Sequence, residues 1–208
     1  MTRLDAAITQ GIPVFGIGGT PISRKGFDLF PLLMQHCRDC RPGSPFLAVW
    51  IGCSPDSPAH ASLDWDVEHL GLRDHCLCIP SLPMAEFREV LSRLRVLTLL
   101  SREDPFPLVV LEAARCGVPT VCFEGSGAIP SLAAQGCCVS VPYLDLSAFA
   151  KAIWELVDHP QQAEAIGWRC RDKVEADFAI DTVAPRLASI LLGPGAAVAP
   201  GTEIASAS

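Results

Sequence analysis

The sequence predicts an α/β domain: a doubly wound parallel sheet of about six strands, with further helices at its C-terminal end. Two observations predict this fold class. Short runs that are almost continuously apolar recur along the chain, as is typical of strands covered on both faces. Segments of helical length and period separate most of these runs, and such alternation builds a parallel sheet. The runs span residues 13–18, 46–52, 76–80, 96–100, 119–123 and 137–142.

The first helix of clear amphipathic pattern follows the run at 13–18. Four apolar side chains between Phe27 and Cys37 recur at spacings of three or four residues, so they fall on one face. Proline lacks the amide hydrogen that a helix interior needs, and Pro31 is tolerated only in a first turn. We therefore expect this helix to begin near Asp28.

The helix after the run at 96–100 contains an acidic residue in an apolar setting. Pro107 suits its first helical position, and Gly117 suits its stop. Glu112 follows four apolar residues and precedes two alanines. A carboxylate placed there is either costly to bury or has a polar partner, with an exposed helical position as the alternative.

The C-terminal part is strongly helical from 146 to 178, with a break at His159-Pro160, and a final helix is expected near 181–192. Residues 193–208 are rich in Gly, Ala, Ser and Pro without apolar periodicity, which predicts a disordered tail. We expect a lead-in over residues 1–12 and one domain over 13–192.

Composition excludes several classes of protein. Half of the 208 residues are hydrophobic and 19% are charged, which indicates a packed core. A net charge of −7 argues against nucleic-acid binding, since such domains concentrate Lys and Arg on one face. The sequence has no apolar run long enough for a membrane span, and its first residues lack the apolar core of a signal peptide. These features predict a cytoplasmic protein.

The ten cysteines are predicted to be free thiols. Five of them lie in or beside short apolar runs, as small buried hydrophobes do. Cys37 and Cys40 have the spacing of zinc ligands, but no second pair follows to complete a tetrahedral site. We therefore expect no metal site and a reducing compartment, rather than zinc or disulfides.

Two loops at predicted carboxyl ends of strands carry unusual residues, and ligands of open parallel sheets bind at these ends. The loop over 16–26 holds Gly18, Gly19 and Thr20, followed by Arg24 and Lys25. It lacks the glycine spacing of a dinucleotide fingerprint and the pattern of a P-loop. Taken alone, the glycines fit a tight turn and the two cations a solvated surface pair.

The second loop contains Asp104 and leads into the helix that contains Glu112. A helix N-terminus with Lys25 beside it suits a diphosphate without a metal ion. The carboxylates of Asp104 and Glu112 can accept hydrogen bonds from hydroxyl groups. A ligand with a diphosphate and hydroxyl groups on both sides of it is a nucleoside diphosphate sugar.

Three stretches, GGTPISRKGFDLF, SREDPFPLVVLEAARCGVPTVCF and GCCVSVPYLD, resemble a known family. They are similar to the C-terminal, donor-binding half of retaining glycosyltransferases with two Rossmann-like domains (the GT-B architecture). The resemblance covers approximately residues 12 to 190. Its most specific part is a pair of acidic residues separated by seven others, here Asp104 and Glu112.

The resemblance implies a role for each candidate residue. Lys25 contacts the donor diphosphate, Asp104 addresses the donor sugar, and Glu112 binds the ribose hydroxyls. Beyond the family pattern, we expect Arg24 to add a second positive charge at the diphosphate. The remaining donor-binding positions are Gly18, Gly19, Thr20 and the backbone amides of Phe106 and Leu108. No cofactor or metal ion is implied.

The sequence also departs from the family pattern. The first acidic residue is usually Glu and here is Asp104, one methylene shorter. Many members carry arginine where this chain has Gly19, and an acidic residue where it has Ser131. An N-terminal acceptor domain needs roughly 150 residues, and only about a dozen precede the first strand.

The function expected from this resemblance is metal-independent sugar transfer from a nucleoside diphosphate sugar, with retention. This chain would be the donor-binding domain, either truncated or paired with a separate chain that supplies the acceptor domain. The alternatives are a nucleotide-sugar-binding or interaction module without transferase activity, a truncated inactive fragment, and a sugar-nucleotide epimerase of the same architecture. In two-domain members the last helix often packs on the N-terminal domain, so residues 181–192 are expected to expose an apolar stripe.

Overall fold

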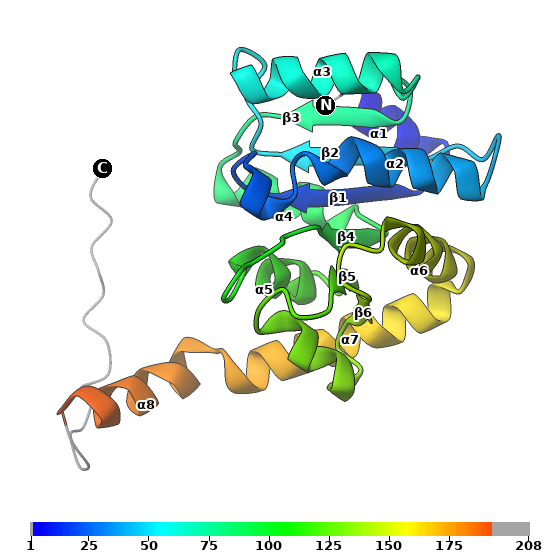
Figure 1. Ribbon diagram of the computed structural model, residues 1–208. Coiled ribbons are helices and arrows are strands. Elements are labelled where there is room, and N and C mark those ends of the chain that lie inside the picture. Colours follow the sequence, from blue (N-terminus) through cyan, green and yellow to red (C-terminus); the bar gives the residue numbers. More distant parts are fainter. Residues whose placement is uncertain (1, 193–208) are drawn as a thin grey trace.

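The structure, a computed structural model, describes residues 2–192. Its centre is a parallel sheet of six strands in the order β3-β2-β1-β4-β5-β6 (Figure 1). The predicted fold class is confirmed, and each apolar run of the sequence contains one strand. The strands are β1 (Val14–Gly18), β2 (Leu47–Ile51), β3 (Cys76–Ile79), β4 (Val96–Leu99), β5 (Thr120–Phe123) and β6 (Val139–Val141).

The direction of the strand order reverses beside β1. The chain runs outward from β1 to β2 and β3, and then crosses back to β4, so β1 pairs in parallel with both β2 and β4. At such a point the loops after the two central strands turn to opposite faces and leave a crevice between them. These loops, after β1 and β4, are the ones that carry the residues singled out in the sequence.

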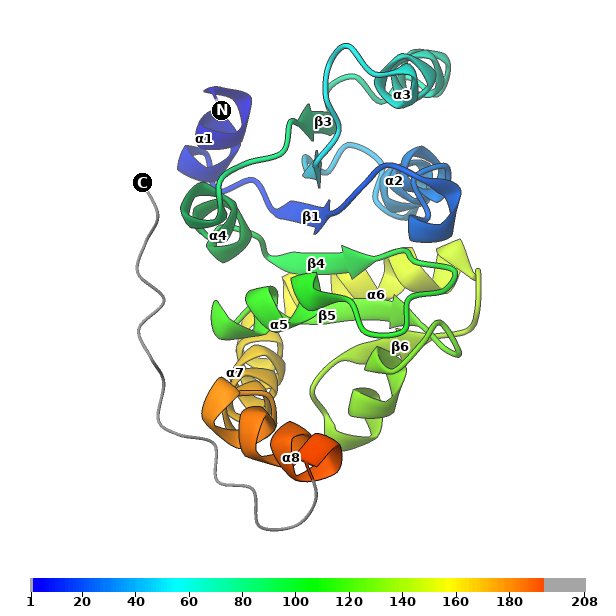
Figure 2. The ribbon, with the colours of Figure 1, turned by 90° about the vertical axis from the view of Figure 1, so that its left-hand side faces the viewer.

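Three helices cover one face of the sheet, as Figure 2 shows: α2 (Leu29–Cys40), α3 (Pro58–His69) and α6 (Leu146–Asp158). Aromatic side chains fill the space between them and the strands. The ring of Trp50 packs edge-on against Phe27 and Phe30, and Trp154 of α6 donates a hydrogen bond of 2.9 Å to the Cys37 carbonyl of α2. The apolar core on this face of the sheet contains more buried residues than the core on the other face.

The other face is covered by α1 (Thr2–Thr9), α4 (Met84–Ser92), α5 (Leu108–Arg115) and α7 (Pro160–Asp177). Helix α7 lies very close to the loop that follows α5. A Cβ atom added to Gly167 of α7 would lie only 1.9 Å from the Gly117 carbonyl oxygen of that loop. Helix α1 lies within the expected lead-in, where no helix is predicted. Its Leu4 is fully buried and Ala7 nearly so.

The helix boundaries follow the sequence signals closely. Helix α2 begins at Leu29, directly after Asp28, and holds Pro31 in its first turn as predicted. Helices α6 and α7 are separated at His159. Pro107 is the residue before α5 rather than its first residue, because its ψ of 113° is still extended. That prediction was wrong by one position.

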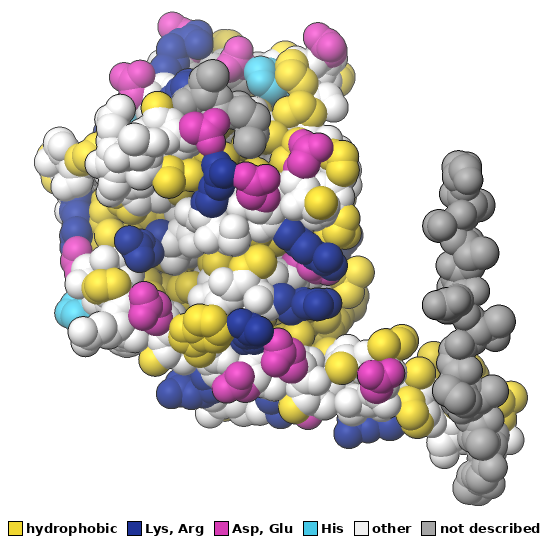
Figure 3. All heavy atoms as spheres, turned by 180° about the vertical axis from the view of Figure 1, so that it is seen from behind, with side chains coloured by type: hydrophobic (Ala, Val, Ile, Leu, Met, Phe, Trp, Pro, Cys, Tyr) yellow, Lys and Arg dark blue, Asp and Glu magenta, His cyan; other side chains and the backbone are white. Residues whose placement is uncertain are grey.

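The final helix, α8 (Ile180–Leu192), has no buried residue. It extends away from the sheet (Figure 1), and hydrophobic side chains lie along this projecting arm in the reverse view (Figure 3). The predicted apolar stripe is confirmed, with Ile190 at 79% and Leu192 at 73% exposure. The predicted disordered tail, 193–208, lies outside the described residues.

The cysteines of the structure follow the pattern expected of free thiols. All ten cysteines are free thiols; of the five placed in apolar runs four are buried and Cys78 is half-buried. Across this part of the chain, no cluster of three or more His, Cys, Asp or Glu side chains could hold a metal ion. No helix described here is long and apolar enough to span a bilayer.

Candidate functional site

A hollow of about 370 Å³ opens at the carboxyl ends of β1 and β2, between the starts of α4 and α5. Five of the residues predicted from the sequence line it: Gly18, Gly19, Thr20, Leu108 and Glu112. The crevice expected at the reversal of strand order is therefore present. The other four predicted residues do not line it: Arg24, Lys25, Asp104 and Phe106.

Three glycines, Gly18, Gly19 and Gly52, form the floor of the hollow with their backbone. At two of them a side chain would collide with neighbouring atoms. A Cβ atom on Gly18 would lie 2.7 Å from the Phe87 ring. Gly19 has a φ of 150°, which favours glycine, and its carbonyl accepts a hydrogen bond of 2.9 Å from the indole of Trp50. A Cβ atom on Gly52 would lie 2.8 Å from that same carbonyl oxygen. Packing thus requires glycine at positions 18 and 52, and the backbone conformation favours it at position 19, whatever the ligand.

A short 3-10 turn, η1 (Ser23–Lys25), presents the two predicted cations. It is fixed by Gly26, which has a φ of 75° and whose added Cβ atom would lie 2.1 Å from the Leu100 carbonyl oxygen. This contact brings the turn against the end of β4. As a result, Lys25 lies beside the second predicted loop although 79 residues separate it from Asp104.

Lys25 and Asp104 form an ion pair between Nζ and Oδ2. The Asp104 residue is 7% exposed, and the Ser101 hydroxyl lies 3.5 Å from the same carboxylate oxygen. The backbone of Asp104 is held as well, because its amide donates to the Ser126 carbonyl at 2.7 Å. This carboxylate is therefore fixed in position and largely shielded from solvent.

The loop after β5 also shapes this part of the site. Gly127 pairs with Asp104 in an isolated parallel bridge, and a Cβ atom on Gly127 would lie 1.8 Å from the Asp104 carbonyl oxygen. This role could not be predicted from the sequence, because Gly127 belongs to a different loop and no motif links the two positions.

Arg24 is exposed and donates a hydrogen bond of 2.8 Å to the Glu103 carbonyl. Arg102, two residues before Asp104, forms a bidentate pair with Asp28, at 2.7 Å for both bonds. Hydrogen bonding from Arg102 lowers the pKa of Asp28. These contacts connect the η1 turn, the start of α2 and the loop after β4.

The Phe106 ring packs on Phe178 at the end of α7, with 5.1 Å between ring centroids, and it does not line the hollow. Among the residues that the structure describes, neither the Phe106 nor the Leu108 amide donates to a backbone carbonyl. Whether either amide contacts a ligand stays a prediction; of the two residues, only Leu108 lines the hollow.

Glu112 has a polar partner that the sequence did not reveal. The guanidinium of Arg88, on α4, donates from Nε to Oε2 at 2.8 Å and from Nη2 to Oε1 at 3.3 Å. This interaction raises the pKa of Arg88. Glu112 and Asp104 therefore have different partners, Arg88 and Lys25 respectively. Sequence spacing gives no sign of Arg88, because it lies 24 residues away on another helix.

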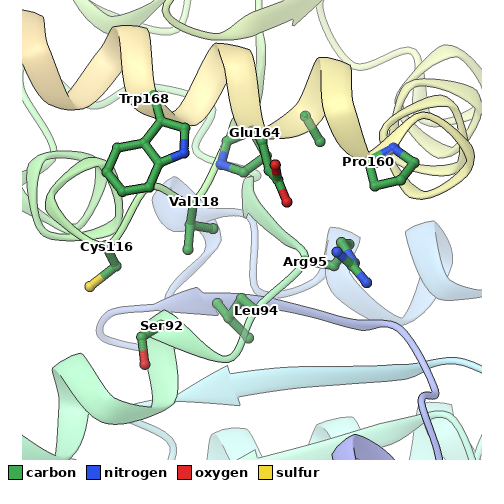
Figure 4. Close-up of a pocket in the computed structure, with 11 residues that line it drawn as sticks. Ser92, Leu94, Arg95, Cys116, Val118, Pro160, Glu164 and Trp168 are labelled. Carbon is green, nitrogen blue, oxygen red and sulfur yellow. The ribbon is translucent and has the colours of Figure 1, made fainter.

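A second hollow, of about 350 Å³, lies at the opposite edge of the sheet (Figure 4). It is lined by Arg95, which precedes β4, and by Val118, which precedes β5, with Trp168 and Glu164 contributed by α7. It is therefore at the amino ends of the strands, and it contains none of the predicted site residues. Because ligands of open parallel sheets bind at the carboxyl ends, the first hollow is the candidate site.

The chain is similar in sequence to parts of two longer enzymes. The chain is 27% identical over 192 residues to the GDP-mannose-dependent monoacylated alpha-(1-6)-phosphatidylinositol monomannoside mannosyltransferase of Corynebacterium glutamicum, over 91% of this chain and 50% of that protein. It is 31% identical over 107 residues to a glycogen synthase of Mycobacterium tuberculosis, over 51% of this chain and 26% of that protein. The chain thus spans at most half the length of these relatives.

Solved structures share the fold. HepE of Anabaena in complex with UDP-glucose superposes with a TM-score of 0.78 at 17% identity, over 92% of this chain and 52% of that one. The C-terminal domain of a group 1 glycosyl transferase family protein (LpcC) from Francisella tularensis has a TM-score of 0.67 at 19% identity, over 86% of this chain and 93% of that one. The predicted architecture, one half of a GT-B glycosyltransferase, is confirmed.

The family model described as "Glycosyl transferases group 1" matches residues 14–172, which include β1 to β6 and every candidate site residue. Since the match extends over more than half of the sequence, the chain belongs to the group 1 glycosyl transferases.

Proposed function

We propose that this chain is the donor-binding domain of a glycosyltransferase and that a nucleoside diphosphate sugar binds in the hollow between β1, α4 and α5. One observation carries the proposal. The fold brings a glycine floor, a lysine, two carboxylates and a helix start to one edge of the sheet, although they come from loops far apart in the sequence. The binding of UDP-glucose by the similarly folded HepE supports the same ligand class.

In this proposal the ligand extends along the strand ends. The ribose lies at Glu112, and the diphosphate lies against the loop of Gly18, Gly19 and Thr20. The start of α5, with the free amides of Phe106 and Leu108, contributes up to about 2 kcal/mol to the binding of the negatively charged diphosphate. A charge-assisted hydrogen bond from Lys25 contributes roughly 1.5–3 kcal/mol more.

Transfer would break the bond between the anomeric carbon and the diphosphate oxygen, and form a bond from that carbon to an acceptor hydroxyl oxygen. The acceptor's proton goes to the departing phosphate oxygen, on the same face of the sugar, so configuration is retained. Lys25 and Arg24 stabilise the negative charge that develops on the diphosphate. With these cations and a helix start, the chemistry needs no metal ion, and Asp104 orients the sugar.

The acceptor would be bound by a further domain or by a partner chain, because the candidate site comprises donor-side groups. We also infer a cytoplasmic location, since ten free thiols are typical of a reducing compartment.

A thermal-shift panel of UDP-, GDP- and ADP-sugars, with and without a chelator, tests the proposal. One nucleotide sugar at a hundredfold excess over its dissociation constant is expected to stabilise the chain by about 2.7 kcal/mol, with no effect of the chelator. Glu112→Ala should strongly reduce this stabilisation, whereas Lys173→Ala, at a half-buried position of α7 that does not line the hollow, should leave it unchanged. A panel without any stabilisation would contradict the proposal.

A second candidate function is nucleotide-sugar binding without transfer. The burial of Asp104 and its pairing with Lys25 favour it, because a carboxylate held in this way has fewer free positions for a sugar hydroxyl. Release of free nucleoside diphosphate from a bound donor, measured with and without candidate acceptors, separates the two functions.

A further inference from the structure

The pair between Arg88 and Glu112 extends the site beyond the residues that the family motif supplies. We infer that Arg88 is a positioning residue, which holds the Glu112 carboxylate in the orientation that accepts the two ribose hydroxyls. This inference rests on the proposed function. It assigns Arg88 a part in nucleotide recognition, although its guanidinium need not touch the ligand.

The position of Arg88 is set by its neighbours on α4. Phe87, the preceding residue, lies over Gly18, where an added Cβ atom would come within 2.7 Å of its ring. Met84 and Phe87 both line the hollow, so α4 forms one of its walls. The contact with Gly18 sets how far this wall stands from β1, and it places the backbone of Arg88, the next residue, at the rim of the hollow.

A second contact holds Arg88 against α5. The Cys116 thiol lies 3.9 Å from the Arg88 carbonyl oxygen and donates to it. Cys116 is one turn beyond Glu112, so the two residues lie on the same face of α5. The Arg88 backbone is thus contacted by Cys116, directly after α5, and its guanidinium by Glu112 within α5.

The geometry of the pair leaves the carboxylate free to bind. A carboxylate has about four lone-pair positions on its two oxygens. Arg88 donates once to each oxygen, at 2.8 and 3.3 Å, so each oxygen keeps a position for another donor. The Glu112 side chain is 21% exposed and lines the hollow, whereas that of Arg88 is 46% exposed. Two oxygens held in one plane match two adjacent hydroxyl groups.

The competing explanation is that the pair only ties α4 to α5. An exposed ion pair contributes about 0–1 kcal/mol to stability, so removing the guanidinium is expected to leave the fold intact. A purely structural role and a positioning role then differ in one measurable property. Only the positioning role makes the effect of Arg88 depend on whether the nucleotide carries ribose hydroxyls.

The test uses the full chain and isothermal titration calorimetry. Binding is measured for UDP, GDP and ADP, and then for the 2′,3′-dideoxy analogue of whichever one the wild type binds. Arg88→Met is expected to weaken binding of the ribonucleotide about tenfold, the equivalent of one charge-assisted hydrogen bond, and that of the dideoxy analogue less than about twofold. Arg88→Lys should recover part of the loss. Added to Glu112→Ala, Arg88→Met should cause no further loss.

Arg93→Met is the matched control, because Arg93 ends the same helix but pairs with Asp5 and Glu89, away from the hollow. It should bind both nucleotides as the wild type does. If Arg88→Met binds the ribonucleotide normally, or weakens both nucleotides equally, the inference is overturned while the proposed function stands. If the wild type binds none of the three nucleotides, the proposed function is overturned and the inference falls with it.

Discussion

Lys25 and Asp104 face each other across the reversal of strand order, one from the loop after β1 and the other from the loop after β4. The side chain of Asp104 is only 8% exposed, and Lys25 is the cation with which it forms an ion pair. The diphosphate of a donor would therefore compete with Asp104 for Lys25. This competition gives the two residues separable effects.

We expect Asp104→Asn to bind a free nucleoside diphosphate at least as tightly as the wild type does, because Lys25 loses its internal counter-ion. The same variant should lose the preference for nucleotide sugar over nucleotide, since the carboxylate no longer accepts from a sugar hydroxyl. Lys25→Met should weaken both ligands by about tenfold or more, the scale of one charge-assisted hydrogen bond. Calorimetric titration with paired ligands measures all of these constants, and a parallel loss in both variants would argue against separate roles.

Gly127 should tolerate no side chain. With a φ of 142° and the Asp104 carbonyl oxygen 1.8 Å from its added Cβ atom, Gly127→Ala must displace the loop that carries Asp104. We expect a destabilisation of about 2 kcal/mol or more, beyond the usual cost of alanine at positive φ. Gly125→Ala is the control, because Gly125 has a φ of 69° but nothing within 4 Å of its added Cβ atom. Urea unfolding compares the two, and equal midpoints would show that the close approach is unimportant.

The pair between Asp28 and Arg102 should make stability depend on pH in the acid range. Its hydrogen bonds lower the pKa of Asp28 below the ordinary value of 3.8. A carboxyl group whose pKa is depressed on folding stabilises the folded state above its unfolded pKa, and this stabilisation is lost as the pH falls through the folded pKa. The difference in unfolding free energy between wild type and Asp28→Asn should therefore be largest near pH 6 and shrink below about pH 4. A difference that is constant over this range would contradict the assignment.

The sequence was sufficient to predict the strands and five of the residues that line the candidate hollow, because both depend on local signals. Apolar runs mark the strands, and the acidic pair lies in one continuous motif around α5. Arg88 and Gly127 were missed for the opposite reason, since each acts on a residue from another segment and only the packing brings them together. Helix α1 was missed because its amphipathic pattern is short, with two buried side chains. Pro107 was misplaced by one residue, because proline suits both the last extended and the first helical position.

The buried thiols should resist alkylation until the chain unfolds. Burial raises the pKa of Cys76 and of Cys170 to about 12, so almost none of either group is thiolate at pH 8. Among residues 2–192, Cys40 is the one exposed cysteine, and the others are buried or half-buried. With iodoacetamide at pH 8, peptide mass spectrometry should show Cys40 modified first, and Cys76 and Cys170 modified only after urea is added. Binding of a nucleotide sugar should slow the second phase, because the ligand stabilises the folded chain. Early modification of Cys76 would indicate that the edge of the sheet at β3 opens readily, which its packing against α3 does not predict.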